Sequence, residues 1–135
     1  MKLNVVIEKG NDGRFDAVLE YSDKITFGLL GQGDTVEDAI TDFYNTYNEM
    51  KQLYADEGRD FPDDLEFIFK YDIQSFLQFY KGKLTLAGLE RITGINQVQL
   101  SQYVNGYRHP SRRTTEKIEK RLQSFGNELS KVQFV

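Results

Sequence analysis

The 135 residues carry a formal net charge of −4, and this balance hides two unequal parts. Residues 1–80 hold 7 Lys or Arg against 17 Asp or Glu, whereas residues 81–135 hold 10 against 4. A basic segment on an otherwise acidic chain is typical of phosphate binding, and the acidic part should instead attract a cationic protein. Because the chain has no cysteine, it has no disulfide framework, no thiolate nucleophile and no cysteine-based zinc site.

The first residues lack the long apolar run of a signal peptide or a membrane span, because charged residues follow within a few positions. We therefore expect a cytoplasmic protein without a membrane partner. We also expect it to need no cofactor.

Two strands at the start of the chain are predicted to form an antiparallel hairpin. Apolar and polar residues alternate over 3–7 and again over 15–21, which is the period of a half-buried strand. Between them, Asn11, Asp12 and Gly13 form a turn signal, since Asp-Gly adopts positive φ readily. The apolar positions of residues 25–30 predict a third strand.

One long helix should follow, with a last strand behind it. Asp34 or Thr35 is placed to cap the helix. The acidic residues in its first turn interact favourably with the helix dipole. The helix should bury a continuous apolar stripe, whose members are Val36, Ile40, Phe43, Tyr47, Met50 and Tyr54. Residues 65–71 alternate again and predict a fourth strand. The order βββαβ predicts an α+β fold with a sheet packed on a helix.

This first half resembles the HicB family of antitoxins. The residues that carry the resemblance are Ile7-Glu8-Lys9, Asn11-Asp12-Gly13 and, above all, Gly31-Gln32-Gly33-Asp34-Thr35-Val36-Glu37-Asp38-Ala39. The family is built on a partial RNase H-like βββαβ domain. The resemblance implies that residues 1–71 form such a domain and that it binds and blocks a small basic, HicA-like ribonuclease toxin.

Residues 72–135 are predicted to form an all-α domain that contains a helix-turn-helix. Ile73, Phe76, Leu77 and Tyr80 recur at helical spacing, and Gly82 follows as a stop signal. The next two helices should place their apolar residues inward, namely Leu86, Leu89 and Ile92 on the first and Leu100, Tyr103 and Val104 on the second. Between these helices, Gly94 supplies a left-handed residue, Ile95 anchors the turn and Asn96 caps the second helix.

This second half resembles the phage-repressor (Cro/C1) type of helix-turn-helix, including Pro110 and Ser111 at the opening of a further helix that carries Ile118 and Leu122. Glu90 departs from the small residue usual at its position, which predicts looser or slightly shifted helix packing. The resemblance places the base-reading positions at Gln97 and Gln102, with Gln99 less favoured, and the phosphate-contacting rim at Asn105, Arg108, Arg112 and Arg113. Gln and Asn suit base reading because they pair bidentately with adenine in the major groove.

Other polar residues of this half are interpreted more plainly. We interpret Lys117, Lys120 and Arg121 as a solvated helix face that contacts the DNA backbone only occasionally. At the end of the chain, Val132 and Phe134 alternate with polar residues, which leaves open a terminal strand, a tail packed on a dimer mate, or a frayed end.

The sequence gives little reason to expect an enzyme. His109 has no nucleophile or second ligand near it in the sequence, so no catalytic or metal role is assigned to it. Asp16 and Glu20 share a strand face, but a strand rise of ~3.3 Å per residue separates them by ~13 Å, too far for one pair of metal ions.

Two hypotheses follow from these observations. The first is a DNA-binding antitoxin that represses its own operon, with partners in operator DNA and in a basic toxin. The second is a stand-alone transcription regulator whose N-terminal domain binds a ligand or another protein. Repressor-type helix-turn-helix proteins act across half-sites ~34 Å apart, so we expect a homodimer or a higher homo-oligomer.

Overall fold

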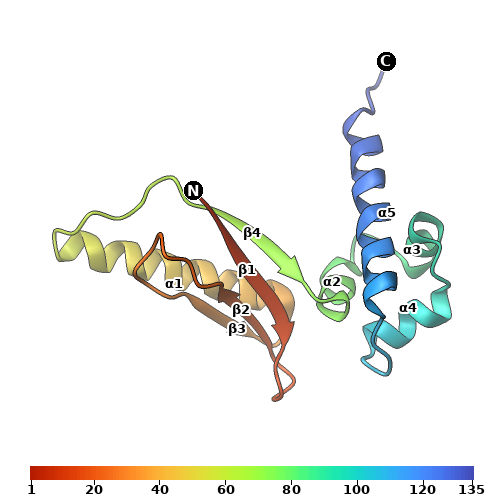
Figure 1. The fold of residues 1–135 in the computed structure, drawn as a ribbon, viewed down its shortest axis with the longest axis horizontal. Helices are drawn as coiled ribbons and strands as arrows, with labels where there is room; N and C mark the ends of the chain where they lie inside the picture. The colour runs from red at the N-terminus through yellow and green to blue at the C-terminus, as the bar shows by residue number, and fades with distance from the viewer. The chain divides into compact units, whose positions relative to one another are not determined.

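The computed structural model describes all residues, 1–135, and divides the chain into two compact units, Met1–Ser75 and Phe76–Val135. The division falls inside helix α2 (Ile73–Tyr80), whereas the sequence placed the boundary before this helix. The fold is α+β, as predicted, with a four-stranded sheet and one long helix followed by a helical region (Figure 1). None of the helices combines the length and the hydropathy needed to span a bilayer.

The sheet of the first unit has the order β3-β2-β1-β4. The strands are β1 (Lys2–Lys9), β2 (Phe15–Leu19), β3 (Leu30–Gly33) and β4 (Glu66–Tyr71). The hairpin of β1 and β2 is confirmed, with Gly13 at φ 81° in its turn, and β4 pairs with β1 in parallel. The predicted order βββαβ is therefore confirmed.

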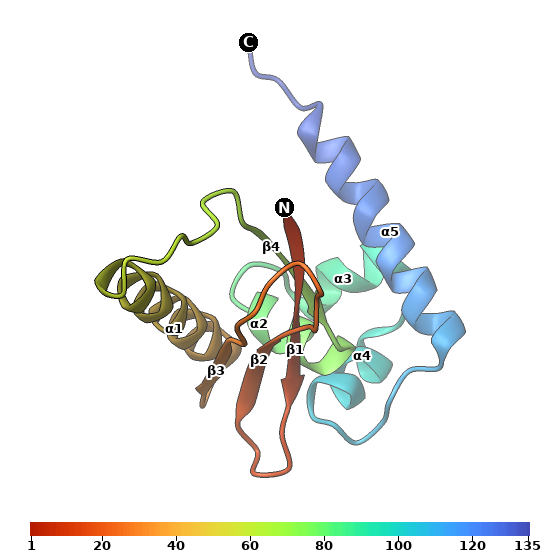
Figure 2. The same ribbon diagram turned by 60° about the vertical axis from the view of Figure 1, so that its left-hand side comes forward.

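Helix α1 (Val36–Asp56) covers one face of this sheet, as Figures 1 and 2 show from two directions. Thr35 is its cap, since the Thr35 hydroxyl accepts a hydrogen bond from the backbone N–H of Asp38 at 3.0 Å. The core beneath the helix consists of Leu3, Val5, Ile7, Phe15, Ala17, Leu19, Val36, Ala39 and Phe43. Phe43 is fully buried and meets Phe67 edge to face, with ring centroids 5.1 Å apart.

The third strand differs from the prediction for residues 25–30, which was wrong in position. Only Leu30 of that run is in β3, and the strand continues through Gly31 to Gly33. The reason is the close approach of α1: a Cβ on Gly31 would lie 2.3 Å from the carbonyl oxygen of Ala39. Glycine lets backbone pack against backbone here, so a stretch that looked like a strand-ending turn forms the strand itself.

The second unit contains α3 (Leu86–Thr93), α4 (Gln97–Val104) and α5 (Arg112–Ser130), after the C-terminal part of α2. The predicted helix-turn-helix order is confirmed, and Ile118 of α5 is buried as expected. Helix α5 runs through Gly126 without a break. Beyond it the chain has no regular structure, and Phe134 is 94% exposed, so no terminal strand forms within this chain.

Candidate nucleic-acid interface

The turn between α3 and α4 is held by Thr93, a residue that the sequence analysis did not single out. The buried Thr93 hydroxyl donates to the carbonyl of Leu89 at 2.7 Å and accepts from the N–H of Ile95 at 3.2 Å. Gly94 between them has φ 77°, the left-handed conformation that glycine adopts without strain. With Ile95 only 8% exposed, both polar and apolar contacts fix the direction in which α4 leaves the turn.

Two side chains satisfy the first amides of α4. Asn96 is the cap predicted from the sequence, and its side-chain oxygen accepts from the N–H of Gln99 at 2.8 Å. The carboxylate of Glu90, on α3, accepts from the N–H of Gln97 at 3.0 Å. A carboxylate is favourable at this end of a helix because the dipole places partial positive charge there.

Glu90 therefore has a role that its departure from the usual small residue did not suggest. The sequence pattern predicted looser or slightly shifted packing of the two helices at this position, and this stays a prediction. In the structure the side chain links α3 to the first amide of α4.

Helix α4 turns Leu100 and Tyr103 inward, where they are 1% and 2% exposed. Its opposite side borders a hollow of about 500 Å³. The residues that line this hollow are Leu86, Gln97, Val98, Ser101, Gln102, Asn105 and Tyr107. We call the five α4 and cap residues among them, Gln97, Val98, Ser101, Gln102 and Asn105, the reading face.

The predicted base-reading glutamines do not all lie together. Gln97 and Gln102 both lie on the reading face, and neither side-chain amide is used in a hydrogen bond within the chain. Gln99 lies elsewhere: its side-chain N–H donates to the hydroxyl of Tyr103 at 2.6 Å in a partly buried position. The side-chain amide of Gln99 is therefore already used within the chain, whereas those of Gln97 and Gln102 are not.

The reading face also holds residues that the sequence analysis missed. Val98 is 70% exposed and Ser101 is half-buried, and both point to the side on which Gln97 and Gln102 lie. Tyr107, beyond the helix, is 84% exposed and borders the same hollow. Helical spacing contained the signal, because positions 97, 98, 101, 102 and 105 fall on one side of a helix.

The predicted phosphate-contacting residues lie in two places. Asn105 caps the end of α4 and lines the hollow beside Gln97 and Gln102. Arg108 and Arg113 are exposed, in the loop after α4 and in the first turn of α5. Arg112, with a side chain 93% exposed, pairs with Glu116 through its Nε at 3.3 Å.

Comparison with known proteins agrees with this geometry. Residues 73–124 match a protein-family model described as Helix-turn-helix, of the Cro/C1 repressor type. The match supports double-stranded DNA binding and transcription regulation by this part of the chain. No curated protein and no solved structure matches the chain. The matched segment begins after β4, so the HicB resemblance depends on the N-terminal residues alone.

Proposed function

We propose that this chain is an operator-binding repressor that inserts α4 into the major groove. The observation that carries the proposal is the reading face, where Gln97 and Gln102 present unpaired side-chain amides from a helix held at its start by Asn96 and Glu90. A major groove ~12 Å wide admits such a helix and presents adenine edges that glutamine pairs with bidentately. The basic rim would set the position of the helix on the backbone.

The repressor would act as a homodimer or a higher homo-oligomer. One copy of α4 covers one half-site, and repressors of this type read two half-sites ~34 Å apart. Dimeric binding would make the operator a pseudo-palindrome.

The test is selection of preferred sequences from a pool of random duplexes with the full chain. We expect a pool enriched in adenine-containing half-sites at a fixed spacing. A pool that stays random while the protein retards all duplexes equally would contradict sequence-specific repression.

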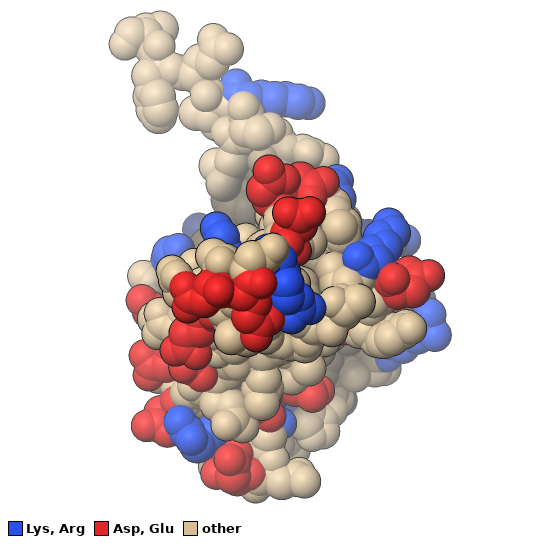
Figure 3. Space-filling model, turned by 90° about the vertical axis from the view of Figure 1, so that its left-hand side faces the viewer, with Lys and Arg blue, Asp and Glu red and all other residues tan.

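We further propose that the N-terminal unit binds a cationic protein and that this partner is a small basic ribonuclease toxin. Residues 1–80 carry ten more acidic than basic side chains, and in the face drawn in Figure 3 acidic groups are widely spread, with fewer basic groups among them. Opposite charge steers such partners together. The HicB resemblance supports the toxin as the particular partner.

The sheet face opposite α1 supports a protein-binding role for this unit. Val18 lies between Val6 and Leu30 in the register of the strands, and Val18 and Leu30 are 37% and 47% exposed. Ile68 of β4 adds a further apolar side chain, 38% exposed. Apolar side chains with acidic neighbours such as Asp16 suit a partner that is basic and partly apolar.

A stand-alone transcription regulator is the second candidate. The family match supports its DNA-binding part, which both candidates share. Purification of the chain from its native host distinguishes the two candidate functions. A small basic protein that co-purifies and cleaves RNA when released would support the antitoxin, and a bound small molecule or an unrelated protein would support the second candidate.

A further inference from the structure

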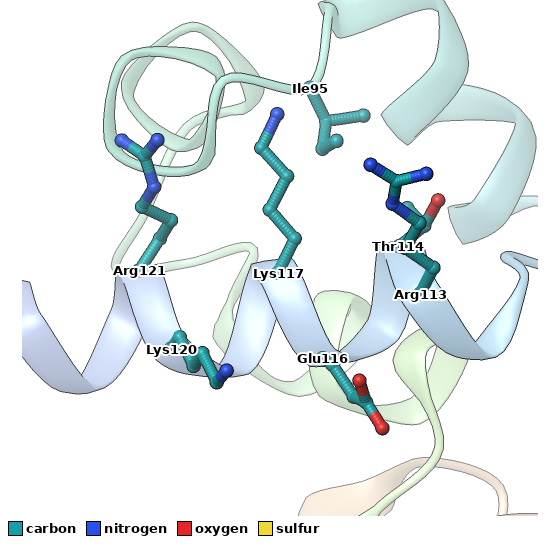
Figure 4. A pocket seen from close by; sticks show the side chains of 7 residues that line it. All are labelled: Ile95, Arg113, Thr114, Glu116, Lys117, Lys120 and Arg121. Carbon is teal, nitrogen blue, oxygen red and sulfur yellow. The ribbon is translucent and has the colours of Figure 1, made fainter.

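Three basic side chains form a row on the side of α5 that faces the turn between α3 and α4. Arg113, Lys117 and Arg121 recur at intervals of four residues, and in Figure 4 all three leave the helix on the side where Ile95 lies. At a rise of ~1.5 Å per residue, the row is about 12 Å long. We call these three residues the cationic row. The sequence analysis interpreted the last two as part of a solvated helix face with occasional contact to the DNA backbone.

The row borders a hollow of about 530 Å³. The lining residues are Ile95, Arg113, Thr114, Glu116, Lys117, Lys120 and Arg121. The ammonium of Lys117 lies 3.4 Å from the position that a Cβ would take on Gly94, so the glycine leaves room for this charge beside the turn. With four basic side chains and one carboxylate, Glu116, the lining carries net positive charge next to the segment that leads into α4.

None of Arg113, Lys117 and Arg121 forms an ion pair within the chain. Glu116, which also lines the hollow, pairs with Arg112 through its Nε at 3.3 Å. Like charges four residues apart on a helix repel each other. An anion bound across the row would relieve this repulsion.

We infer that the cationic row binds phosphates of the DNA backbone next to the half-site that α4 enters. The inference depends on the proposed function, because it places the row beside a helix that is in the groove. Ile95, which lines the hollow, directly precedes the cap residue of α4, so the row lies in the same unit close to the end of α4 that would enter the groove. Arginine binds phosphate bidentately and lysine binds it as a point charge, so both residue types suit a run of phosphates.

The experiment measures how the affinity of the full chain for duplex DNA depends on salt, for the wild type and for Lys117→Gln, Arg121→Gln and the double variant. Each phosphate contact contributes a slope of about −0.9 in log affinity against log salt, so the double variant should lose about two units of slope. Between about 50 and 200 mM salt, the wild-type affinity should then fall about tenfold more than that of the double variant. Glutamine keeps much of each apolar stem, which limits the loss of packing.

Lys131→Gln is the matched control. It also removes one positive charge, but Lys131 is an exposed residue at the far end of the same helix. The control should keep the wild-type slope. Equal slopes for Lys117→Gln, Arg121→Gln and the wild type would overturn the inference, and so would an equal loss in Lys131→Gln, which would indicate net charge alone. A lower melting temperature with an unchanged slope would assign the row to stability and also overturn it. If the wild type itself does not bind duplex DNA, the result contradicts the proposed function rather than this inference.

Discussion

The carboxylate of Glu90 accepts a hydrogen bond from the backbone N–H of Gln97 and so joins α3 to the first residue of α4. Glu90→Ala should open the start of α4, at a cost of about 0.5–2 kcal/mol in the stability of this unit by analogy with lost helix caps. Glu90→Gln keeps an acceptor oxygen and should lose only the charge contribution, about 0.3–1 kcal/mol. Hydrogen exchange at the Gln97 amide, followed by NMR, measures the effect directly.

The control for Glu90 is Glu128→Ala, which removes an exposed carboxylate from α5 and leaves α4 untouched. It should leave the exchange of the Gln97 amide as it is in the wild type. Wild-type protection of that amide in Glu90→Ala would show that Asn96 alone suffices to hold the helix start.

The two unpaired glutamines of the reading face should set sequence preference. Gln97→Ala or Gln102→Ala should cost on the order of 1–3 kcal/mol on the preferred duplex and much less on random DNA, because each lost bidentate pair carries sequence information. Gln99→Ala should change preference little, since its amide is already bonded to Tyr103. Titrations on preferred and random duplexes compare the three variants, and equal losses on both duplexes for Gln97 and Gln102 would refute their assignment as base readers.

Val98 should contact a thymine methyl group if α4 enters the groove, because its exposed apolar side chain lies beside Gln97 and Gln102. Replacing thymines of the selected site one at a time by deoxyuridine removes only the methyl. One such replacement should weaken wild-type binding by about 1 kcal/mol, close to the ~0.8 kcal/mol of a buried methylene. The same replacement should have a smaller effect on Val98→Ala, because the shorter side chain makes less contact with the methyl. An effect in Val98→Ala as large as in the wild type would place the methyl contact elsewhere.

Arg112 should bind a phosphate without sequence preference, and its ion pair with Glu116 makes this testable from both sides. Arg112→Ala should weaken binding to all duplexes alike and reduce the salt slope by about one unit. Glu116→Gln should strengthen binding to all duplexes, because it frees the guanidinium and removes a negative charge near the backbone. Weaker binding by Glu116→Gln would show that the carboxylate is needed to orient Arg112.

The sequence predicted the helix-turn-helix in detail because its signals are local. A left-handed glycine at 94, a cap at Asn96 and inward Leu100 and Tyr103 all act within a few residues, and the structure confirms each of them. The helix order and the hairpin of the first unit follow from similar short-range periodicity. The base-reading and phosphate-contacting roles stay predictions.

Features that depend on contacts between distant residues could not be predicted. Glu90 and Gln97 are seven positions apart, and only the angle between α3 and α4 brings carboxylate and amide together. The hydrogen bond between Gln99 and Tyr103 joins residues only four positions apart, but it depends on how the two side chains are oriented, which spacing alone does not give. The position of β3 depends on how closely α1 approaches the strand. The local pattern over residues 25–30 does not predict this approach.

The close approach of α1 to β3 gives the sharpest stability prediction in the first unit. A Cβ on Gly31 would lie 2.3 Å from the backbone of Ala39 and Phe43, so Gly31→Ala must push the helix away from the strand. The expected loss is about 1–3 kcal/mol, the usual cost of overpacking a core. Gly28→Ala is the matched control, because its new methyl would meet nothing within 4 Å. Urea unfolding of the full chain measures both variants, and equal stabilities would mean that α1 and β3 are farther apart in solution than in the structure.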